Sequence, residues 1–190
     1  EGLELRDGVV WGTVPDRVSL TENGLKLEDD LHGGQKAGYF LDQKLNREFI
    51  KRHAAGKRVL DCFCNVGGFA LHAAAGGASH VVGVDSSAPV IEQARRHAEM
   101  NGFTQCEFVQ ANVFDVLRSQ SLDPGPASWD LIILDPPSFA KSRSALPGAR
   151  AGYAEINRQA LKSLAPGGWL VTASCTQLIS ELDLLDIIYT

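Results

Sequence analysis

The hydrophobic pattern of the first residues predicts a β-hairpin. In residues 17–29 (RVSLTENGLKLED), apolar and polar positions alternate on both sides of Asn23-Gly24. This dipeptide suits a type I′ turn, which joins two antiparallel strands. We therefore expect residues 1–34 to form a small β appendage or linker domain.

Residues 41–55 have a helical period instead. Leu41, Leu45, Phe49 and Ile50 recur at the spacing of one helix face, and Gly56 follows as a stop signal. The sequence thus predicts a helix over these residues that ends at Gly56.

From residue 58 the period alternates between short apolar runs and helical segments. Such alternation predicts βαβ units, and therefore an α/β fold with a doubly wound, Rossmann-like parallel sheet and helices on both faces. We assign residues 35–190 to this domain. The predicted strands are 58–63, 80–85, 106–111, 130–135 and 168–175, and the predicted helices are 68–75, 88–102, about 113–119, 153–165 and one from about residue 180. Residues 119–129 are interpreted as a surface loop, and residues 138–152 as a longer, flexible loop.

Composition and charge narrow the class of protein. The chain has 190 residues, of which 44% are hydrophobic and 22% charged, as in a soluble domain. Because no run of about 20 apolar residues and no leader occurs, a cytoplasmic location is expected and no membrane partner. The net charge of −5 lies in the first 30 residues, which does not favour broad contact with phosphates. Basic residues between 44 and 58 fit a solvated helix face, whereas those between 141 and 150 lie beside a motif.

The four cysteines point to packing or to a thiolate. Cys62 and Cys64 form one pair without a second, and no histidine stands at ligand spacing, so no metal site is expected. Disulfides do not suit the expected compartment. Cys106 and Cys175 complete the set, and Cys175 follows the last predicted strand.

The ends of the predicted strands carry the candidate chemistry, since ligands of open α/β sheets bind there. The first end reads LDCFCNVGGFA, where glycines allow close backbone approach to a ligand. The second ends in Asp85, a carboxylate suited to the two hydroxyls of a ribose. Phe63 and Asn65 stand where a pyrophosphate-binding turn would have glycines, so an adenosine-type ligand other than a dinucleotide is indicated.

Four motifs together resemble class I S-adenosylmethionine-dependent methyltransferases over residues 58–190: Asp61 to Phe69, Asp85, Asn112, and the Asp135-Pro136-Pro137 run. The segments GQKAGYFLDQKLNR, CFCNVGGFA, LDPPSFAKS, GYAEIN and SCT resemble, in order and spacing, the RlmI-like family of bacterial large-subunit ribosomal RNA (cytosine-5) methyltransferases.

This resemblance implies a bound S-adenosylmethionine and a ribosomal RNA partner. The cofactor pocket that it implies comprises Tyr39, Gln43, Asp61, Phe63, Asn65, Gly67, Gly68, Asp85, Ser86, Asn112, Val113 and Asp135. It also implies an RNA-binding PUA domain before the β appendage. A homodimer is one possible assembly. The final antiparallel strand pair of the class is expected to be missing from this chain.

Methylation at carbon 5 of cytosine would give Cys175 a chemical role. Carbon 5 of cytosine is a poor nucleophile until a thiolate adds to carbon 6. Cys175 is therefore the expected nucleophile, with Asp135 hydrogen-bonded to the ring and Lys141 as a group that could favour the thiolate. The predicted substrate-binding residues are Pro136, Pro137, Phe139, Lys141, Arg143 and Tyr153.

Other interpretations stay open at this point. Cys175 could be a packing residue, the two prolines could only stiffen a loop, and Tyr153 could only begin a helix. An amine methyltransferase is an alternative, because acid-Pro-Pro-aromatic motifs hold planar amines, although Ser138 separates the prolines from Phe139. A noncatalytic module that binds the cofactor or RNA is another. Asn112 stands where an acid often binds the adenine amine, and its amide oxygen could accept instead.

Overall fold

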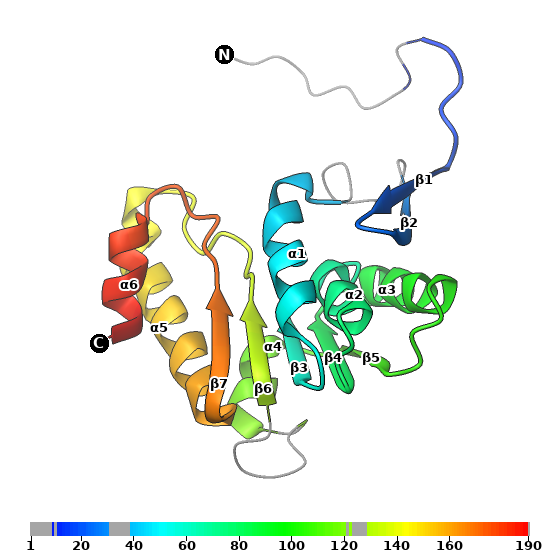
Figure 1. Cartoon of the computed structure of the whole chain (residues 1–190). Helices are drawn as coiled ribbons and strands as arrows, with labels where there is room; N and C mark the ends of the chain where they lie inside the picture. The colour runs from blue at the N-terminus through cyan, green and yellow to red at the C-terminus, as the bar shows by residue number, and fades with distance from the viewer. Residues whose placement is uncertain (1–8, 10, 31–38, 121, 123–128, 190) are drawn as a thin grey trace.

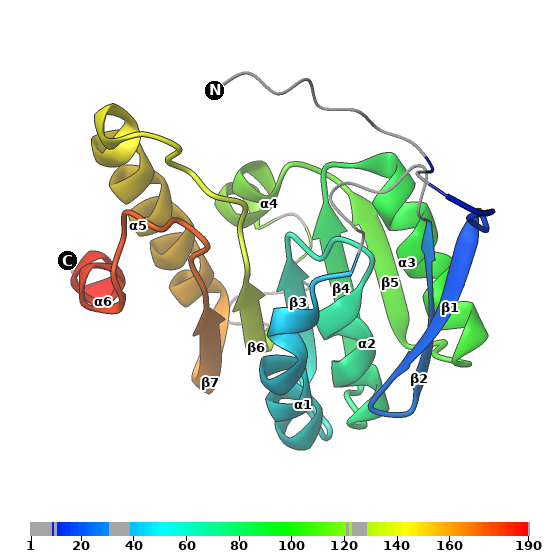
Figure 2. The same ribbon diagram turned by 90° about the horizontal axis from the view of Figure 1, so that it is seen from above.

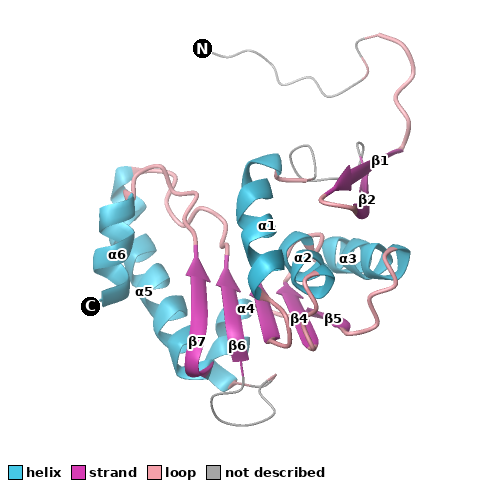
Figure 3. Ribbon diagram, in the orientation of Figure 1, coloured by secondary structure: helices cyan, strands magenta, loops and turns pink. Residues whose placement is uncertain are grey.

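A five-stranded parallel sheet forms the centre of the molecule (Figures 1 and 3). The structure is a computed structural model that describes residues 9, 11–30, 39–120, 122 and 129–189. The strand order is β5-β4-β3-β6-β7. Their bounds are β3 Arg58–Cys62, β4 His80–Asp85, β5 Cys106–Gln110, β6 Trp129–Leu134 and β7 Leu164–Thr172. The chain runs outward from β3 to β5 and then crosses back to β6, which creates a switch point between β3 and β6. The predicted fold class is confirmed.

Helices cover both faces of this sheet (Figure 2). One face carries α1 (Lys44–His53), α2 (Gly68–Ala75), α3 (Ala88–Met100) and the hairpin, and the other carries α4 (Val113–Ser119), α5 (Leu146–Ser163) and α6 (Glu181–Tyr189). Each face of the sheet has its own hydrophobic core. Successive residues of a strand point to opposite faces, so they belong alternately to the two cores. Leu131 and Ile133 of β6 belong to the first core, and Ile132 and Leu134 to the second.

The predicted hairpin is present as β1 (Arg17–Glu22) and β2 (Leu25–Asp30). Asn23 and Gly24 both have positive φ, at 51° and 86°, as a type I′ turn requires. Leu25 and Leu27 are buried in the core that contains α2 and α3. The hairpin therefore packs against the sheet domain.

The predicted apolar face of α1 is wrong. A 3-10 turn (η1, Leu41–Gln43) precedes the helix, and Leu41 and Leu45 are 70% and 80% exposed. Ile50 is buried as predicted, but Arg47 is buried beside it at 3% exposure. Arg47 bonds to Glu22 of the hairpin and to the carbonyl of Phe40, and apolar spacing does not reveal such polar contacts.

The predicted long loop at residues 138–152 is also partly wrong. A 3-10 turn (η2, Arg143–Ala145) leads into α5, which begins at Leu146 and not at Tyr153. Gly148 and Gly152 suggested a loop, but Ala149 continues the buried stripe of the helix. Pro147 fits because it stands in the first turn, where a missing N–H costs nothing.

The last strand also differs from its prediction. β7 starts four residues before the predicted 168 and ends at Thr172, so Cys175 lies in the loop beyond it. In the described part of the chain, β5 and β7 are the edges of the parallel sheet. None of the helices described is both long and apolar enough to cross a membrane.

Candidate functional site

The turn between β3 and α2 forms the floor of the site. Phe63, Asn65 and Gly67 all have left-handed φ values, at 62°, 49° and 84°. Phe63 and Asn65, which stand where a pyrophosphate-binding turn would have glycines, thus adopt a backbone conformation that glycine favours and that is rare for a bulky residue such as phenylalanine. A Cβ on Gly67 would lie 3.1 Å from the Phe108 ring, and one on Gly68 would lie 3.2 Å from Cδ of Arg47. The two glycines therefore allow these side chains to pack closely against the backbone of the turn.

Two carboxylates, one half-buried and one buried, hold this turn in place. Asp85, at the end of β4, accepts hydrogen bonds from the backbone N–H of Asn65 and of Ser87, both at 3.0 Å. Asp61 is fully buried, and its Oδ2 accepts from the N–H of Ala70 at 2.9 Å. Among the described residues, its Oδ1 has no hydrogen-bond partner. Burial, opposed by the Ala70 hydrogen bond, raises the pKa of Asp61 to about 8.

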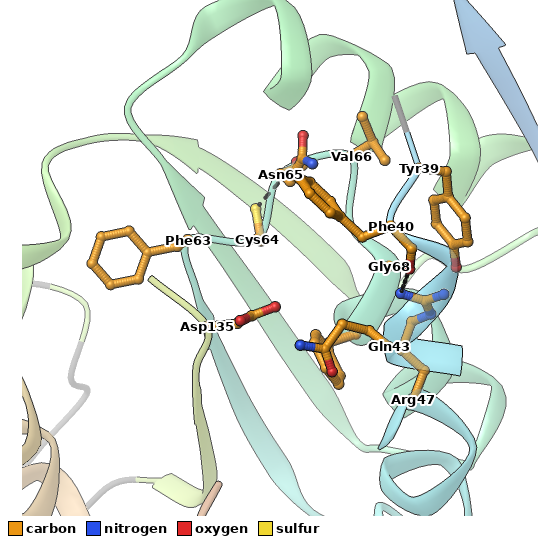
Figure 4. A pocket seen from close by; sticks show the side chains of 11 residues that line it. Tyr39, Phe40, Gln43, Arg47, Phe63, Cys64, Asn65, Val66, Gly68 and Asp135 are labelled. Carbon is orange, nitrogen blue, oxygen red and sulfur yellow. Dashed lines mark hydrogen bonds between the residues drawn. The ribbon is translucent and has the colours of Figure 1, made fainter. Parts of the chain in front are cut away.

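A pocket opens above the turn (Figure 4). It brings together residues from β3 to α2, from the start of α1 and from the end of β6. Its lining is Tyr39, Phe40, Gln43, Arg47, Phe63, Cys64, Asn65, Val66, Gly68, Phe69 and Asp135. In Figure 4 the ring of Phe63 points away from the α1 side, while Asp135 lies between Phe63 and Gln43. Five of the predicted cofactor residues besides Asp135 line this pocket: Tyr39, Gln43, Phe63, Asn65 and Gly68.

The remaining predicted cofactor residues surround the turn. Asn112 caps α4, because its Oδ1 accepts from the N–H of Phe114 at 2.9 Å, so this oxygen already has a structural role. Val113 is buried at the start of the same helix. Ser86 is exposed, and its carbonyl accepts from the side chain of Gln110 at 3.3 Å.

A charged cluster forms the α1 wall of the pocket. Arg47 donates to both carboxylate oxygens of Glu22, from Nε at 2.6 Å and from Nη2 at 3.0 Å. The hydroxyl of Tyr39 donates to the same carboxylate at 2.9 Å. We call Glu22, Arg47 and Tyr39 the Glu22 cluster. The sequence did not single out Glu22 or Arg47, since buried charges are rare and apolar spacing does not predict them.

Asp135 and Cys175 lie just beyond the ends of the neighbouring strands β6 and β7. Asp135 lines the pocket, whereas Cys175 is not among its lining residues. Strands β6 and β7 are paired, and the N–H of Ala173 still donates to the carbonyl of Leu134 at 2.8 Å. Cys175 is exposed, and its thiol donates to the carbonyl of Pro136 at 3.6 Å. Burial, with a smaller contribution from Asp42, raises the pKa of Asp135 to about 6.

A network of hydroxyls joins the two loops that carry these residues. Tyr153 is fully buried and lies within hydrogen-bond distance of Thr176, at 2.9 Å between oxygens. Ser174 donates to the Tyr153 hydroxyl at 3.0 Å, and Ser138 lies 3.1 Å from the Thr176 hydroxyl. We call Ser138, Tyr153, Ser174 and Thr176 the hydroxyl cluster. Tyr153, predicted to contact substrate, is instead enclosed by protein, and the other three were missed because single hydroxyls give no sequence signal.

The other predicted substrate residues lie along the loop after β6. Pro137, Lys141 and Arg143 are exposed, whereas Pro136 is buried. Phe139 packs on Tyr153 with ring centroids 4.6 Å apart, and Phe114 lies 5.8 Å from Phe139. The exposed members can reach a ligand, and the buried ones shape the loop.

The remaining cysteines are packing residues. Cys62 and Cys64 are buried, and desolvation raises the pKa of both thiols well above the ordinary value. Cys106 is half-buried on the edge strand β5. Among the residues that the structure describes, no group of three or more His, Cys, Asp or Glu could hold a metal ion.

The site fits S-adenosylmethionine in both shape and charge. Gly68 of the turn lines the pocket, so a ligand can approach its backbone closely. The carboxylate of Asp135, which also lines the pocket, suits a cationic ligand such as an amino acid carrying a sulfonium.

Comparisons with known proteins agree with this geometry. The family described as S-adenosylmethionine-dependent methyltransferase matches residues 10–186. The chain is 47% identical, over 95% of its length, to ribosomal RNA large subunit methyltransferase I of Photobacterium profundum, and 41% identical over 96% to the protein of that name from Vibrio cholerae. It spans about half the length of these relatives, 46% and 47%.

Solved structures show the same fold. A methyltransferase complexed with SAH superimposes with a TM-score of 0.81 at 28% identity, over 95% of this chain and 47% of that one. A methyltransferase from Agrobacterium tumefaciens gives a TM-score of 0.77 at 20% identity, over 93% of this chain and 58% of that one, which supports the fold alone. The family match over residues 10–186 agrees with the pocket beside the turn between β3 and α2, and this chain belongs to the S-adenosylmethionine-dependent methyltransferases.

Proposed function

We propose that this chain is the catalytic part of an enzyme that methylates carbon 5 of a cytosine in large-subunit ribosomal RNA. One observation carries the proposal: an exposed cysteine, Cys175, contacts the carbonyl of Pro136, the residue directly after Asp135. The names of the curated relatives support the RNA substrate. With such a substrate, the protein would work in the cytoplasm.

The proposed chemistry uses the two neighbouring strand ends. The thiolate of Cys175 adds to carbon 6 of cytosine, which pushes electrons toward carbon 5 and makes it able to attack a methyl group. S-adenosylmethionine supplies this methyl from its sulfonium. A base then removes the proton from carbon 5, and the thiolate leaves as the double bond re-forms.

In this proposal Asp135 stabilises the ring during the attack. Because its pKa is raised to about 6, the carboxyl holds a proton more readily than an ordinary aspartate. A protonated carboxyl can donate a hydrogen bond to the ring nitrogen that gains electron density. We expect Asp135→Asn, which keeps a donor, to retain more activity than Asp135→Ala.

A trapping experiment tests the nucleophile. RNA with 5-fluorocytosine at the target position should form a stable covalent adduct with the complete enzyme, because fluorine cannot leave carbon 5 as a proton does. Cys175→Ser should abolish this adduct and leave affinity for S-adenosylmethionine nearly unchanged. An adduct that persists in Cys175→Ser would place the nucleophile elsewhere. Full methylation without any adduct would favour an amine methyltransferase, and cofactor binding without methylation a noncatalytic module.

RNA binding is expected to depend on chain outside these 190 residues. The net charge of −5 gives little general attraction to phosphate, and flipping a base costs a few kcal/mol. Lys141 and Arg143 are exposed and can supply local contacts. Binding of a target RNA fragment should strengthen in the full-length protein, and its salt dependence should steepen. Sedimentation of the full-length protein would test the homodimer.

A further inference from the structure

A carboxylate of the hairpin organises the wall of the cofactor pocket. Glu22, the last residue of β1, is only 4% exposed and does not line the pocket itself. It receives three hydrogen bonds, two from Arg47 and one from Tyr39, and both donors line the pocket. Glu22 thus fixes two residues of the pocket lining without lining the pocket itself.

Arg47 passes this constraint to the pocket surface (Figure 4). Its third nitrogen, Nη1, donates to the carbonyl of Phe40 at 2.9 Å, and its guanidinium lies 4.3 Å from the centre of the Tyr39 ring. Its Cδ approaches the place where a Cβ on Gly68 would stand, at 3.2 Å. Arg47 therefore contacts both the segment from Tyr39 to Phe40 and the turn at Gly68.

The electrostatics favour a fixed ion pair. Desolvation alone would raise the pKa of Glu22, but hydrogen bonds from Arg47 and Tyr39 outweigh it and hold the pKa below the ordinary value. His72, 3.5 Å from Glu22, has its pKa lowered by burial, and its Nδ1 donates to the carbonyl of Gly68 at 2.7 Å. Arg47 is therefore the cation that balances the buried carboxylate.

A second contact links the hairpin to the same turn. His97 of α3 is 1% exposed and donates from Nδ1 to the carbonyl of Val66 at 3.0 Å. Its Nε2 accepts from the N–H of Glu28 in β2, also at 3.0 Å. The hairpin thus reaches the cofactor turn from two sides, through α1 and through α3.

We propose that Glu22 is a positioning residue for the cofactor, and that hairpin docking and cofactor binding are energetically coupled. By linkage, a hairpin that stabilises the pocket must itself be stabilised when the pocket is filled. This inference concerns the cofactor site alone and holds whatever the methylated substrate is.

Hydrogen exchange on the unmodified chain tests the coupling without any substitution. Adding SAH should slow amide exchange in the hairpin, although the described hairpin residues do not line the pocket. Peptides from α6, on the opposite side of the sheet, provide the internal reference and should slow less. Equal slowing in the hairpin and α6, or none in the hairpin, would overturn the proposal.

A matched pair of substitutions tests Glu22 itself. Glu22→Gln keeps the shape of the side chain and removes its charge, and the affinity for SAH should fall about tenfold or more, as for a lost hydrogen bond to a charged group. Arg17→Gln is the control, because this side chain is on the same hairpin, is 53% exposed and pairs only with Glu28, at 3.6 Å, among the ion pairs of the described residues. It should change SAH affinity less than about twofold.

The two measurements together separate positioning from folding. In folded Glu22→Gln, SAH should still slow exchange in the cofactor turn but should no longer slow it in the hairpin. Unchanged affinity for SAH in folded Glu22→Gln would overturn the proposal. If Glu22→Gln fails to fold, the exchange experiment on the unmodified chain decides the question.

Discussion

Two polar clusters hold opposite sides of the candidate site, and they differ in charge. The Glu22 cluster supports the cofactor side with a buried ion pair, whereas the hydroxyl cluster supports the Cys175 side with neutral groups. A broken ion pair leaves an uncompensated buried charge, while a broken neutral pair loses a single hydrogen bond. A change of arrangement therefore costs more at the wall formed by the Glu22 cluster than in the loop that carries Cys175.

The largest effect is expected on the charged side. Arg47→Met should lower the free energy of unfolding by about 3–5 kcal/mol, because Glu22 remains buried without its partner. The double variant Glu22→Leu/Arg47→Met should recover most of this loss. Urea unfolding measures both, with Arg17→Met in the exposed pair with Glu28 as the control. If Arg47→Met costs no more than Arg17→Met, the contrast between the clusters is wrong.

A smaller effect is expected for Asp85, which holds the cofactor turn from the neighbouring strand β4. Asp85→Ala removes the acceptor for the N–H of Asn65 and the expected contacts to the ribose hydroxyls. Affinity for S-adenosylmethionine should weaken by about 1.5–3 kcal/mol. Calorimetric titration measures it, and unchanged affinity would rule out this placement of the ribose.

Removing one member of the hydroxyl cluster should have a modest effect on stability. Tyr153→Phe deletes the bonds to Thr176 and Ser174, and should lower the free energy of unfolding by about 0.5–1.5 kcal/mol. If the cluster positions Cys175, adduct formation with 5-fluorocytosine RNA should slow while affinity for SAH stays the same. An unchanged rate of adduct formation would show that the cluster serves stability alone.

The smallest effect is a pH trend at Asp135. Its pKa of about 6 in the folded protein lies above the ordinary 3.8, so folding favours its protonated form. The contribution of this group to the stability of the folded protein is therefore fully present below pH 3.8 and is lost as the pH rises to about 6. Relative to the unmodified chain, Asp135→Asn should therefore gain stability between pH 4 and 6, by no more than about 1 kcal/mol after solvent screening. A gain that grows instead above pH 7 would assign the trend to another group.

Local patterns were sufficient for most of the fold. The Asn23-Gly24 turn requires positive φ at both positions, so the hairpin could be predicted from two residues and their flanks. Strand β6 contains a continuous apolar run at residues 131–134, which is typical of buried parallel strands. Helix α2 begins and ends at the predicted residues, since glycines mark both of its ends.

The errors arose where glycine and polar residues have tertiary roles. The start of α5 falls in the predicted loop at residues 138–152, yet Phe139 packs against Gly152, where a Cβ would stand 3.3 Å from its ring. The orientation of α1 could not be predicted because Arg47 is buried. A buried charge needs a partner, and Glu22, which supplies the opposite charge, lies 25 residues away in the chain.

The sequence by itself determined the order of elements, the Asp85 and Asp135 strand ends and Cys175 as the candidate nucleophile, because each depends on local residue type and spacing. Only the tertiary structure decided which side chains support them. Glu22 reaches the pocket through α1, and Tyr153 reaches the Cys175 loop from the middle of α5. Hydrogen bonds and ion pairs require distances of about 3 Å between groups far apart in the chain, and no periodicity of the sequence encodes such distances.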